Sequence, residues 1–586
     1  MLATVLISWK TTMKSNIKQG KELDRKKLLS DPILMIIITG ISALLILFVI
    51  YPLIMLIGES FEVESGESFL ANYVNVFKMS TFKSALANTL TIGVISSLLA
   101  AVVGFIFAYV DAYIDLKSGF LKAIFNIVAT LPIVSPPFVL ALSALFLFGN
   151  AGLVTRGIFG MLSSNIKGYP GIILVQTLTY FPTVYLMLKG LLRNIDPSLE
   201  EAVRNMGASR FKEFFTVTLL LLLPGIGNAF LVCFLESCAD FANPMLIGGN
   251  VDTLATSIYL QYTGGWSTGS AGNAAAMAVY LLMITTVFFL IQKYVLEARS
   301  VATLTGKASR ARILIEDKSV TVPLKIVAGV IGSFVVIMYL CVFYGSIMTV
   351  WGRNYHPTLK WWKYLFSGSG EGFKAFGVSF GLAFISACLT SLFAMLIAYI
   401  VVKKRFVGRK AIEFVSMLAM AVPGTVLGVA YIRGFVTGVF HSGFLAGIYG
   451  SSAILIIVFV VRSLPVGVRS GISALNQIDK SIEESAYDMG ANTAKVFSSV
   501  TLPLIKDSFF SGLITSFVRS ITSISAVILL VTPRIPFITV RINAYADNGN
   551  FGVACVYATV LILLGYASIG ILDLMTKKLT IKKTEI

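Results

Sequence analysis

Glu200-Glu201-Ala202-Val203-Arg204-Asn205-Met206-Gly207-Ala208 is a short polar stretch between two apolar segments, and it decides the fold because the chain repeats it. The second copy is Glu483-Glu484-Ser485-Ala486-Tyr487-Asp488-Met489-Gly490-Ala491. The same offset of 283 residues pairs Pro182 with Pro465 in the preceding apolar segments. A register that is kept without a gap from an apolar segment into a polar loop indicates that one module has been duplicated.

The composition indicates an integral membrane protein. Of the 586 residues, 56% are hydrophobic and only 13% are charged. Apolar runs of about 20 residues are long enough to cross a bilayer, and the sequence contains roughly twelve of them. Because backbone polar groups inside a bilayer must be satisfied within the chain, we expect these runs to be helices. The predicted fold is therefore all-α, a polytopic membrane protein of about twelve transmembrane helices.

The expected spans form two sets of six, as the duplication requires. They are 33–57, 85–110, 121–148, 169–192, 214–247 and 272–296, then 322–350, 373–402, 411–440, 444–470, 500–531 and 551–576. An even number of spans in each copy makes the two copies parallel in the membrane. The predicted organisation is a basic N-terminal segment (1–32), a first module (33–296) with its polar loop at 193–215, a linker (297–320), a second module (321–576) with its polar loop at 471–498, and a tail (577–586).

Positive charge is distributed unevenly between the loops. The net charge of +18 comes largely from the segment before the first span, the linker, the loop that follows Lys403 and the tail, whereas residues 248–271 contain no Lys or Arg. This asymmetry is the positive-inside pattern, so we expect both termini and both repeated loops in the cytoplasm. Charge confined to loops beside the membrane also argues against nucleic acid as a partner, and in favour of the lipid bilayer.

Each repeated loop has the pattern of a short helix that ends in a glycine turn. Asp196 and Asp479 stand where a side chain can accept the free N–H groups of a helix start, and the glutamates that follow complement the helix dipole. Gly207 and Gly490 lie about two turns later, where a glycine with positive φ can end a helix. Short helices exposed on one side of a membrane protein can serve as a docking element for a partner's groove.

The repeated loop resembles the coupling loop of ABC importer permeases, whose pattern is Glu-Ala-Ala, three residues, Gly, and a stretch ending in Leu-Pro. The chain is similar to such a permease with both halves fused, over nearly its whole length. Departures from the pattern occur at Val203, Ser485 and Leu220. The resemblance assigns ATPase coupling to Glu200, Glu201, Ala202 and Gly207 in the first copy and to Glu483, Glu484, Ala486 and Gly490 in the second.

The same resemblance implies the partners. It implies that the loop helices insert into clefts on two copies of a cytoplasmic ABC ATPase subunit, and that an extracytoplasmic binding protein delivers the substrate. It also implies a bacterial plasma (inner) membrane location. Gly306-Lys307 lacks the earlier glycine and the following Ser or Thr of a phosphate loop. We therefore expect a transport subunit that is not an enzyme and binds no cofactor, with ATP used by the partner subunit.

Ionisable residues inside the spans mark a candidate substrate pathway, because charge is costly there. Glu236 and Asp240 lie four residues apart, on one helical face. The 283-residue offset places Arg519 opposite Glu236 and Ser523 opposite Asp240. Two interpretations stay open. These residues form either an acidic wall that faces a basic and hydroxyl wall around a channel, or a structural Glu236–Arg519 pair that joins the halves.

The run Asp240-Phe241-Ala242-Asn243-Pro244 resembles ferric iron importer permeases most closely, and it adds Asn243 to the candidate pathway. The expected substrate is therefore ferric iron, and no metal-ligand set can be named. Polyamine, thiamine and phosphonate permeases share much of the pattern and remain alternatives. Arg433 and Arg462 also lie in spans and could be ion-pair partners, gates or snorkelling residues.

Two other classes of protein are alternatives to a permease of this kind. A secondary transporter can also have twelve spans in two parallel halves, but that architecture does not require a repeated Glu-Glu loop. A scaffold without a transport function would not explain acidic and basic residues inside the membrane.

Overall fold

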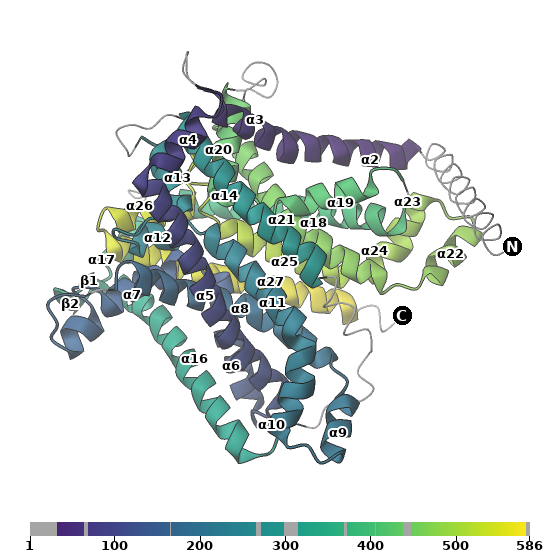
Figure 1. Cartoon of the computed structure of the whole chain (residues 1–586), viewed down its shortest axis with the longest axis horizontal. Helices are drawn as coiled ribbons and strands as arrows, with labels where there is room; N and C mark the ends of the chain where they lie inside the picture. Colours follow the sequence, from purple (N-terminus) through teal and green to yellow (C-terminus); the bar gives the residue numbers. More distant parts are fainter. Residues whose placement is uncertain are drawn as a thin grey trace.

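The structure is a computed structural model that describes residues 32–63, 68–164, 166–264, 271–297, 314–367, 372–404, 406–437 and 447–581. The predicted N-terminal segment, apart from its last residue, and most of the predicted linker lie outside these residues. The described chain is almost entirely helical, and its helices form two diverging arms (Figure 1). Ten of the described helices are long and apolar enough to cross a membrane, and two shorter apolar helices accompany them. The predicted polytopic all-α fold is confirmed.

The first half contains helices α2 to α14, with π-helical segments labelled η between them. The bounds are α2 (Pro32–Leu45), η1 (Ile46–Ile50), α3 (Tyr51–Ser60), α4 (Ala71–Lys78), α5 (Ser80–Tyr113), α6 (Gly119–Val134), α7 (Phe138–Phe148), η2 (Leu153–Ile158), α8 (Tyr169–Asn194), α9 (Pro197–Asn205), α10 (Arg210–Glu213), η3 (Phe214–Thr218), α11 (Leu219–Cys238), α12 (Ala242–Ile247), α13 (Leu254–Tyr262), α14 (Ala271–Ile291) and η4 (Gln292–Glu297).

The second half repeats this order and adds a two-stranded antiparallel hairpin. The bounds are α16 (Lys318–Ser346), β1 (Met348–Val350), β2 (Asn354–Pro357), α17 (Lys360–Phe366), α18 (Gly372–Lys403), α19 (Arg409–Leu418), α20 (Gly424–Ile432), η5 (Arg433–Thr437), α21 (Ser452–Asn476), α22 (Lys480–Asp488), α23 (Thr493–Val496), η6 (Phe497–Thr501), α24 (Leu502–Leu504), α25 (Lys506–Ile521), α26 (Ile538–Asp547) and α27 (Phe551–Ile581). The predicted span 322–350 ends earlier, at Ser346, because residues 348–350 pair in β1. The predicted tail begins inside α27.

Four predicted spans are wrong as continuous helices: 121–148, 214–247, 411–440 and 500–531. Proline explains three of the breaks, because it lacks an N–H and disfavours helix at the residue before it. Pro136 follows Ser135, which is extended (φ −91°, ψ 148°) and ends α6. Pro423 separates α19 from α20. The ring of Pro244 would clash with the carbonyl of residue 240 in a continuous helix, so α11 ends before it. In the fourth span, α25 ends at Ile521 and turns follow.

The first spanning helix of each half packs against the other half. Tyr51 of α3 donates a hydrogen bond to the carbonyl of Gly434 in η5 (2.9 Å). Conversely, Ser143 of α7 donates to the carbonyl of Met338 in α16 (2.6 Å). Figure 1 shows α16 in the arm that contains α5, α6 and α8, and α2 in the arm that contains α18 and α21. The two sequence modules therefore exchange their first helices and are not separate bodies.

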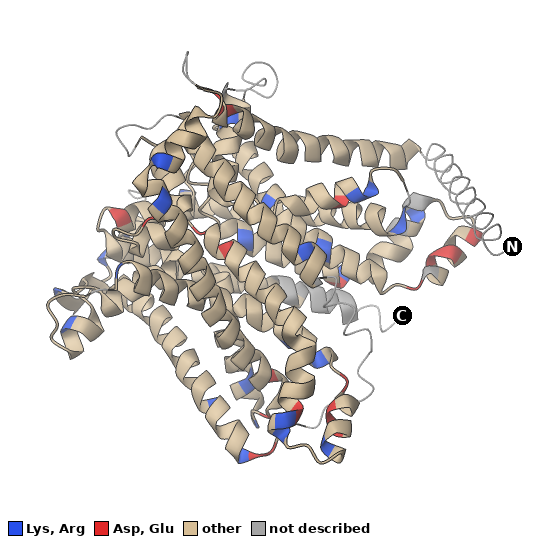
Figure 2. Cartoon of the chain, in the orientation of Figure 1, with Lys and Arg blue, Asp and Glu red and all other residues tan. Residues whose placement is uncertain are grey.

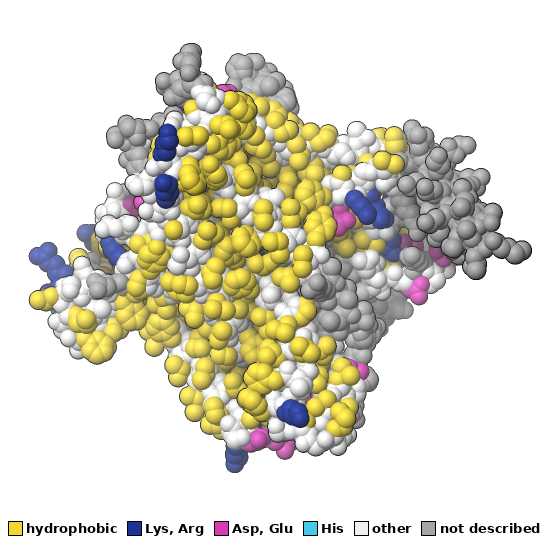
Figure 3. Space-filling model, in the orientation of Figure 1, with side chains coloured by type: hydrophobic (Ala, Val, Ile, Leu, Met, Phe, Trp, Pro, Cys, Tyr) yellow, Lys and Arg dark blue, Asp and Glu magenta, His cyan; other side chains and the backbone are white. Residues whose placement is uncertain are grey.

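Apolar side chains cover the middle of the visible face, and charged side chains gather at its ends (Figure 3). Figure 2 shows charged residues around α9 and α10 at the tip of one arm and around α22 and α23 at the tip of the other. Leu98 and Val102 of α5 are 56% and 52% exposed, as expected for side chains that contact lipid. The repeated loops thus project from one end of an apolar belt.

Candidate functional site

Helices α9 and α22 are the two copies of the repeated loop, and their ends have the same geometry. The carboxylate of Asp196 accepts the backbone N–H two residues later at 2.9 Å, and that of Asp479 does so at 3.0 Å. This bond holds the pKa of Asp479 below its usual range. Gly207 and Gly490 follow the helices with φ of 86° and 82°. A Cβ at either glycine would have no neighbour within 4 Å, so the backbone angle, rather than crowding, requires glycine. The predicted caps and glycine turns are confirmed.

Glu200 lies on the inner side of α9 and is 3% exposed. Its Oε1 accepts hydrogen bonds from the hydroxyl of Thr218 (3.1 Å) and from that of Tyr113 (2.5 Å). Tyr113 ends α5, and Thr218 immediately precedes α11. Glu200 therefore ties the repeated helix to the bases of two spanning helices.

Glu483 anchors α22 in the same way and is 7% exposed. Its Oε1 accepts from the hydroxyl of Thr501 (2.9 Å), which lies 283 residues after the threonine of the first copy. Its Oε2 lies 3.2 Å from Nζ of Lys403, which ends α18 as Tyr113 ends α5. The two anchoring glutamates thus lie behind the exposed face of each helix and position it.

The exposed face of each repeated helix is apolar at equivalent positions. Leu199 and Met206 of the first copy are 49% and 78% exposed, and Ile482 and Met489 of the second are 45% and 81% exposed. Sequence reasoning assigned this face to charged residues and missed these four. The signal was present, because a methionine precedes the glycine in both polar loops.

The other predicted coupling residues surround these apolar side chains. Glu201 is half-buried, Ala202 and Glu484 are exposed, and Ala486 is buried. Glu201 and Glu484 thus reach the surface to different extents, although they occupy equivalent positions.

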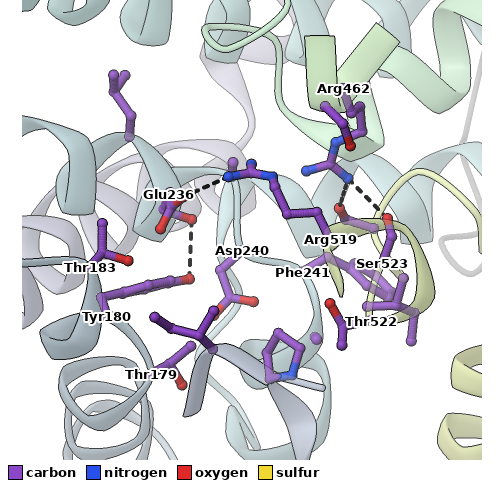
Figure 4. A pocket seen from close by; sticks show the side chains of 18 of the residues that line it. Thr179, Tyr180, Thr183, Glu236, Asp240, Phe241, Arg462, Arg519, Thr522 and Ser523 are labelled. Atoms are coloured by element: carbon purple, nitrogen blue, oxygen red, sulfur yellow. Dashed lines mark hydrogen bonds and ion pairs between the residues drawn. The ribbon is translucent and has the colours of Figure 1, made fainter. Parts of the chain in front are cut away.

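A cavity of about 250 Å³ lies between the two halves, where the helices break. Its charged lining residues are Glu236 and Asp240 from the first half and Arg462 and Arg519 from the second (Figure 4). Hydroxyl groups line much of the rest: Ser135, Thr179, Tyr180, Thr183, Ser463, Thr522, Ser523 and Ser525.

The internal repeat relates the two walls of the cavity. The 283-residue offset pairs Thr179 with Arg462, Tyr180 with Ser463, Glu236 with Arg519 and Asp240 with Ser523, and an offset of 287 pairs Ser135 with Val422. The cavity therefore lies where a pseudo-twofold axis would relate the halves. Its charges break this symmetry, since the acidic groups come from one half and the basic groups from the other.

Glu236 and Arg519 point toward one another across the boundary between the halves (Figure 4). Oε1 of Glu236 lies 3.7 Å from Nη1 of Arg519, and the side chains are 30% and 39% exposed. Tyr180 donates to the backbone carbonyl of Glu236 (3.2 Å). The ion pair therefore joins the halves, and both of its members also line the cavity.

Asp240 is held by neutral amides. Its Oδ2 accepts from Nε2 of Gln176 (2.9 Å) and from Nδ2 of Asn243 (2.8 Å). Asn243 is fully buried and does not line the cavity, although the sequence placed it on the pathway. It stands behind Asp240 and orients that carboxylate. Gln176 was not identified from the sequence.

Comparison with known proteins places the chain in a family. The family model described as "Binding-protein-dependent transport system inner membrane component" matches residues 100–300 and 390–581, one segment in each half. The chain belongs to this family. The permease is 33% identical over 567 residues to a ferric transport system permease protein of Actinobacillus pleuropneumoniae, with 96% of the chain and 81% of the relative covered. It is 35% identical over 502 residues to a putative ferric transport system permease protein of Haemophilus influenzae, with 84% and 77% covered.

The permease is also similar to relatives that are named for other cargo. It is 28% identical over 224 residues to a spermidine/putrescine transport system permease homolog of Mycoplasma genitalium, with 37% of the chain and 72% of the relative covered. Membership of the family makes the chain a multi-pass transport subunit, and it excludes the secondary transporter and the scaffold as alternatives.

The structure shows the contacts of Arg462, whose role the sequence did not decide. Nη1 of Arg462 donates to the hydroxyls of Ser525 (2.9 Å) and Ser523 (3.4 Å) on the wall of the permease cavity. Arg433 lies elsewhere and forms an ion pair with Glu62. The repeat offset did not identify Arg462, because the equivalent position in the first half is Thr179 of α8, which the sequence did not place on the pathway.

Proposed function

We propose that the permease imports a ferric iron species from an extracytoplasmic binding protein into the cytoplasm. Two copies of a separate cytoplasmic ABC ATPase subunit would dock on α9 and α22 and hydrolyse the ATP. The chain itself would bind no cofactor and would have no ATP site. Its place would be the bacterial plasma (inner) membrane, with both termini and both docking helices in the cytoplasm. The names of the two ferric relatives support the choice of cargo.

The observation that carries the proposal is the connection between each docking helix and the charged cavity. Helix α9 is anchored at the base of α11, and α11 carries Glu236 at its other end. Helix α22 is anchored before α25, and α25 carries Arg519 near its end. A shift of the docking helices therefore has a direct structural route to both members of the ion pair that spans the cavity.

The carboxylates of the cavity suit a hard cation, provided that the cation is released again. Oxygen ligands favour hard, highly charged ions. Transport requires binding that is favourable enough for entry and weak enough for exit. Glu236 is compensated by Arg519, and Asp240 by amide donors. These side chains would therefore determine the electrostatic potential along the pathway and would not form a high-affinity metal site.

Uptake of labelled iron by cells that express the full system tests this proposal. Glu236→Gln and Asp240→Asn should each lower the uptake rate about tenfold, the order expected for a lost charge-assisted contact. Asp507→Asn, an equivalent change at the exposed start of α25, should leave uptake unchanged. Normal uptake by both cavity variants would remove these residues from the pathway. Uptake of a polyamine, thiamine or a phosphonate in place of iron would show that this ligand, and not ferric iron, is the cargo.

A further inference from the structure

The two arginines of the cavity have different partners. Arg519 lies 3.7 Å from the carboxylate of Glu236. Arg462 contacts the hydroxyls of Ser523 and Ser525, and within the described part of the chain no carboxylate lies within 4.0 Å of it. The charge of Arg462 is therefore contacted only by neutral groups on a wall that opens to the cavity.

The backbone beside Arg462 is shaped to admit its guanidinium group. A Cβ at Gly424 would lie 2.7 Å from Nη1 of Arg462 and would overlap Oγ of Ser525, so only glycine allows both groups to stay where they are. Gly424 is also the first residue of α20, whose N-terminus has no side-chain cap. A helix N-terminus carries a partial positive charge, which adds to that of the arginine. This end of the cavity is therefore electropositive.

The wall of the cavity that the first half contributes is acidic, whereas the wall with Arg462 is basic. Asp240 is a carboxyl group of the acidic wall, and the side chains that contact it, Gln176 and Asn243, are neutral. Because Glu236 and Arg519 pair with each other, one carboxylate and one guanidinium remain for a cargo. A bare ferric ion would be repelled by Arg462, since like charges repel strongly where water is scarce. A cargo that carries both signs of charge fits the two walls.

We propose that Arg462, with Ser523 and Ser525, forms a binding site for an oxyanion group of the cargo, a carboxylate or a phosphate. A guanidinium with neighbouring hydroxyl donors matches the geometry of both groups. The cargo would then cross as a ferric ion with its oxyanion ligand, the ion toward Asp240 and the oxyanion toward Arg462. The inference rests on the proposed function in two respects, since it takes this cavity as the pathway and the ferric ion as the cation of the cargo.

Doubly labelled cargo tests the inference in proteoliposomes that contain the permease, its ATPase and its binding protein. The probes are radioactive iron with labelled citrate, radioactive iron with labelled phosphate, and iron held in a neutral tris-hydroxamate complex. We expect iron to enter together with one labelled oxyanion, and the oxyanion that enters separates a carboxylate source from a phosphate source. The neutral complex should enter about tenfold more slowly, the effect of one lost charge-assisted hydrogen bond.

Variants of the site provide the second part of the test. Arg462→Gln should lower the entry of both labels about tenfold, and Arg462→Lys should recover part of it, because lysine keeps the charge but loses the planar donor pair. Arg156→Gln, the same change at an exposed residue of η2, should have no effect. If Arg462→Gln fails to assemble, Ser525→Ala and Gly424→Ala test the same site through a lost donor and a displaced guanidinium.

The outcomes separate this inference from the proposed function. Iron that enters without either oxyanion, at a rate unchanged in the site variants, overturns the oxyanion site and leaves ferric import standing. Citrate or phosphate that enters without iron overturns ferric import and supports the oxyanion site. Uptake of a polyamine instead overturns both, since a polycation carries no oxyanion.

Discussion

Equivalent residues in the two halves anchor α9 and α22 with different chemistry. Glu200 accepts hydrogen bonds from two neutral hydroxyls, whereas Glu483 pairs with the ammonium group of Lys403. The side chain of Lys403 is only 9% exposed. Removing one partner of a buried ion pair leaves the other charge uncompensated, which costs more than the loss of a neutral hydrogen bond.

We therefore predict that Glu483→Gln costs on the order of 3 kcal/mol of stability, because it leaves the ammonium group of Lys403 uncompensated. Thermal unfolding of the purified complex measures this loss, and ATPase stimulation reports the function. Combining Glu483→Gln with Lys403→Tyr, which replaces the ammonium group by a neutral donor, should recover most of the loss. A double variant as unstable as Glu483→Gln alone would contradict this account.

The glycine turns lead to a second prediction at this scale. Gly207→Ala and Gly490→Ala should each cost about 1 kcal/mol, because a left-handed backbone is strained for any L-residue with a side chain. The corresponding Val variants should cost more, since a branched Cβ makes this backbone an outlier. Space is not limiting at either site. Uptake at matched expression should decrease from Gly to Ala to Val, and equal rates for Ala and Val would show that φ does not matter.

At the scale of elements, interrupted helices bring polar groups together in the cavity between the two halves. A continuous helix satisfies its own backbone, and a break is tolerated in a bilayer only where it is buried in protein or lines a cavity. The breaks after α6, α11 and α25 all contribute residues to the cavity wall. Broken helices at a repeat interface are also the arrangement in which transporters place their substrate sites.

We predict that the exposed methionines at the ends of α9 and α22 contact the ATPase partner. Met206→Asp together with Met489→Asp should leave the protein folded, because both side chains are about four-fifths exposed. The double variant should lose copurification with the ATPase and its stimulation, since an apolar contact becomes a buried charge. Asn205→Asp with Asp488→Asn is a matched control on the same exposed turns. Undiminished binding by the methionine variant would show that this face does not contact the partner.

At the scale of the whole molecule, the exchange of first helices makes the two halves one body. Each half contributes a helix to the other arm (Figure 1), and each half lines one wall of the cavity. Helices α9 and α22 lie at the same end of the apolar belt, and the β1–β2 hairpin lies away from them (Figure 1). The proposed ATPase partner would therefore reach both helices from one side of the membrane.

Orientation in the membrane is predicted at this scale. Single cysteines at Asn150 and Asn548 should react with an impermeant thiol reagent in intact cells, whereas cysteines at Ser209 and Lys410 should not. All four positions are exposed, and the five native cysteines are buried or half-buried, which keeps the background low. The physical reason is the retention of basic loops in the cytoplasm. Permeabilised cells, in which all four should react, provide the control. The opposite labelling pattern would reverse the orientation and remove α9 and α22 from the cytoplasm.

The sequence by itself determined the features that are local or periodic. Apolar run length predicted the spanning helices except in the four spans that are broken, and Asp196 and Gly207 with their copies predicted the ends of α9 and α22. The repeat offset predicted that Glu236 faces Arg519, because a parallel duplication places equivalent positions on either side of one axis.

Only the tertiary structure decided what depends on contacts between distant segments. A one-dimensional pattern does not say which face of a helix meets a neighbour, so it did not show that Glu200 is buried and Met206 exposed, or that Asn243 stands behind Asp240. The pattern also did not show that Arg462 lines the cavity. The sequence did not predict the exchange of the first helices for the same reason. An apolar span can be buried against either half, and the shapes of the packed surfaces determine which half it contacts.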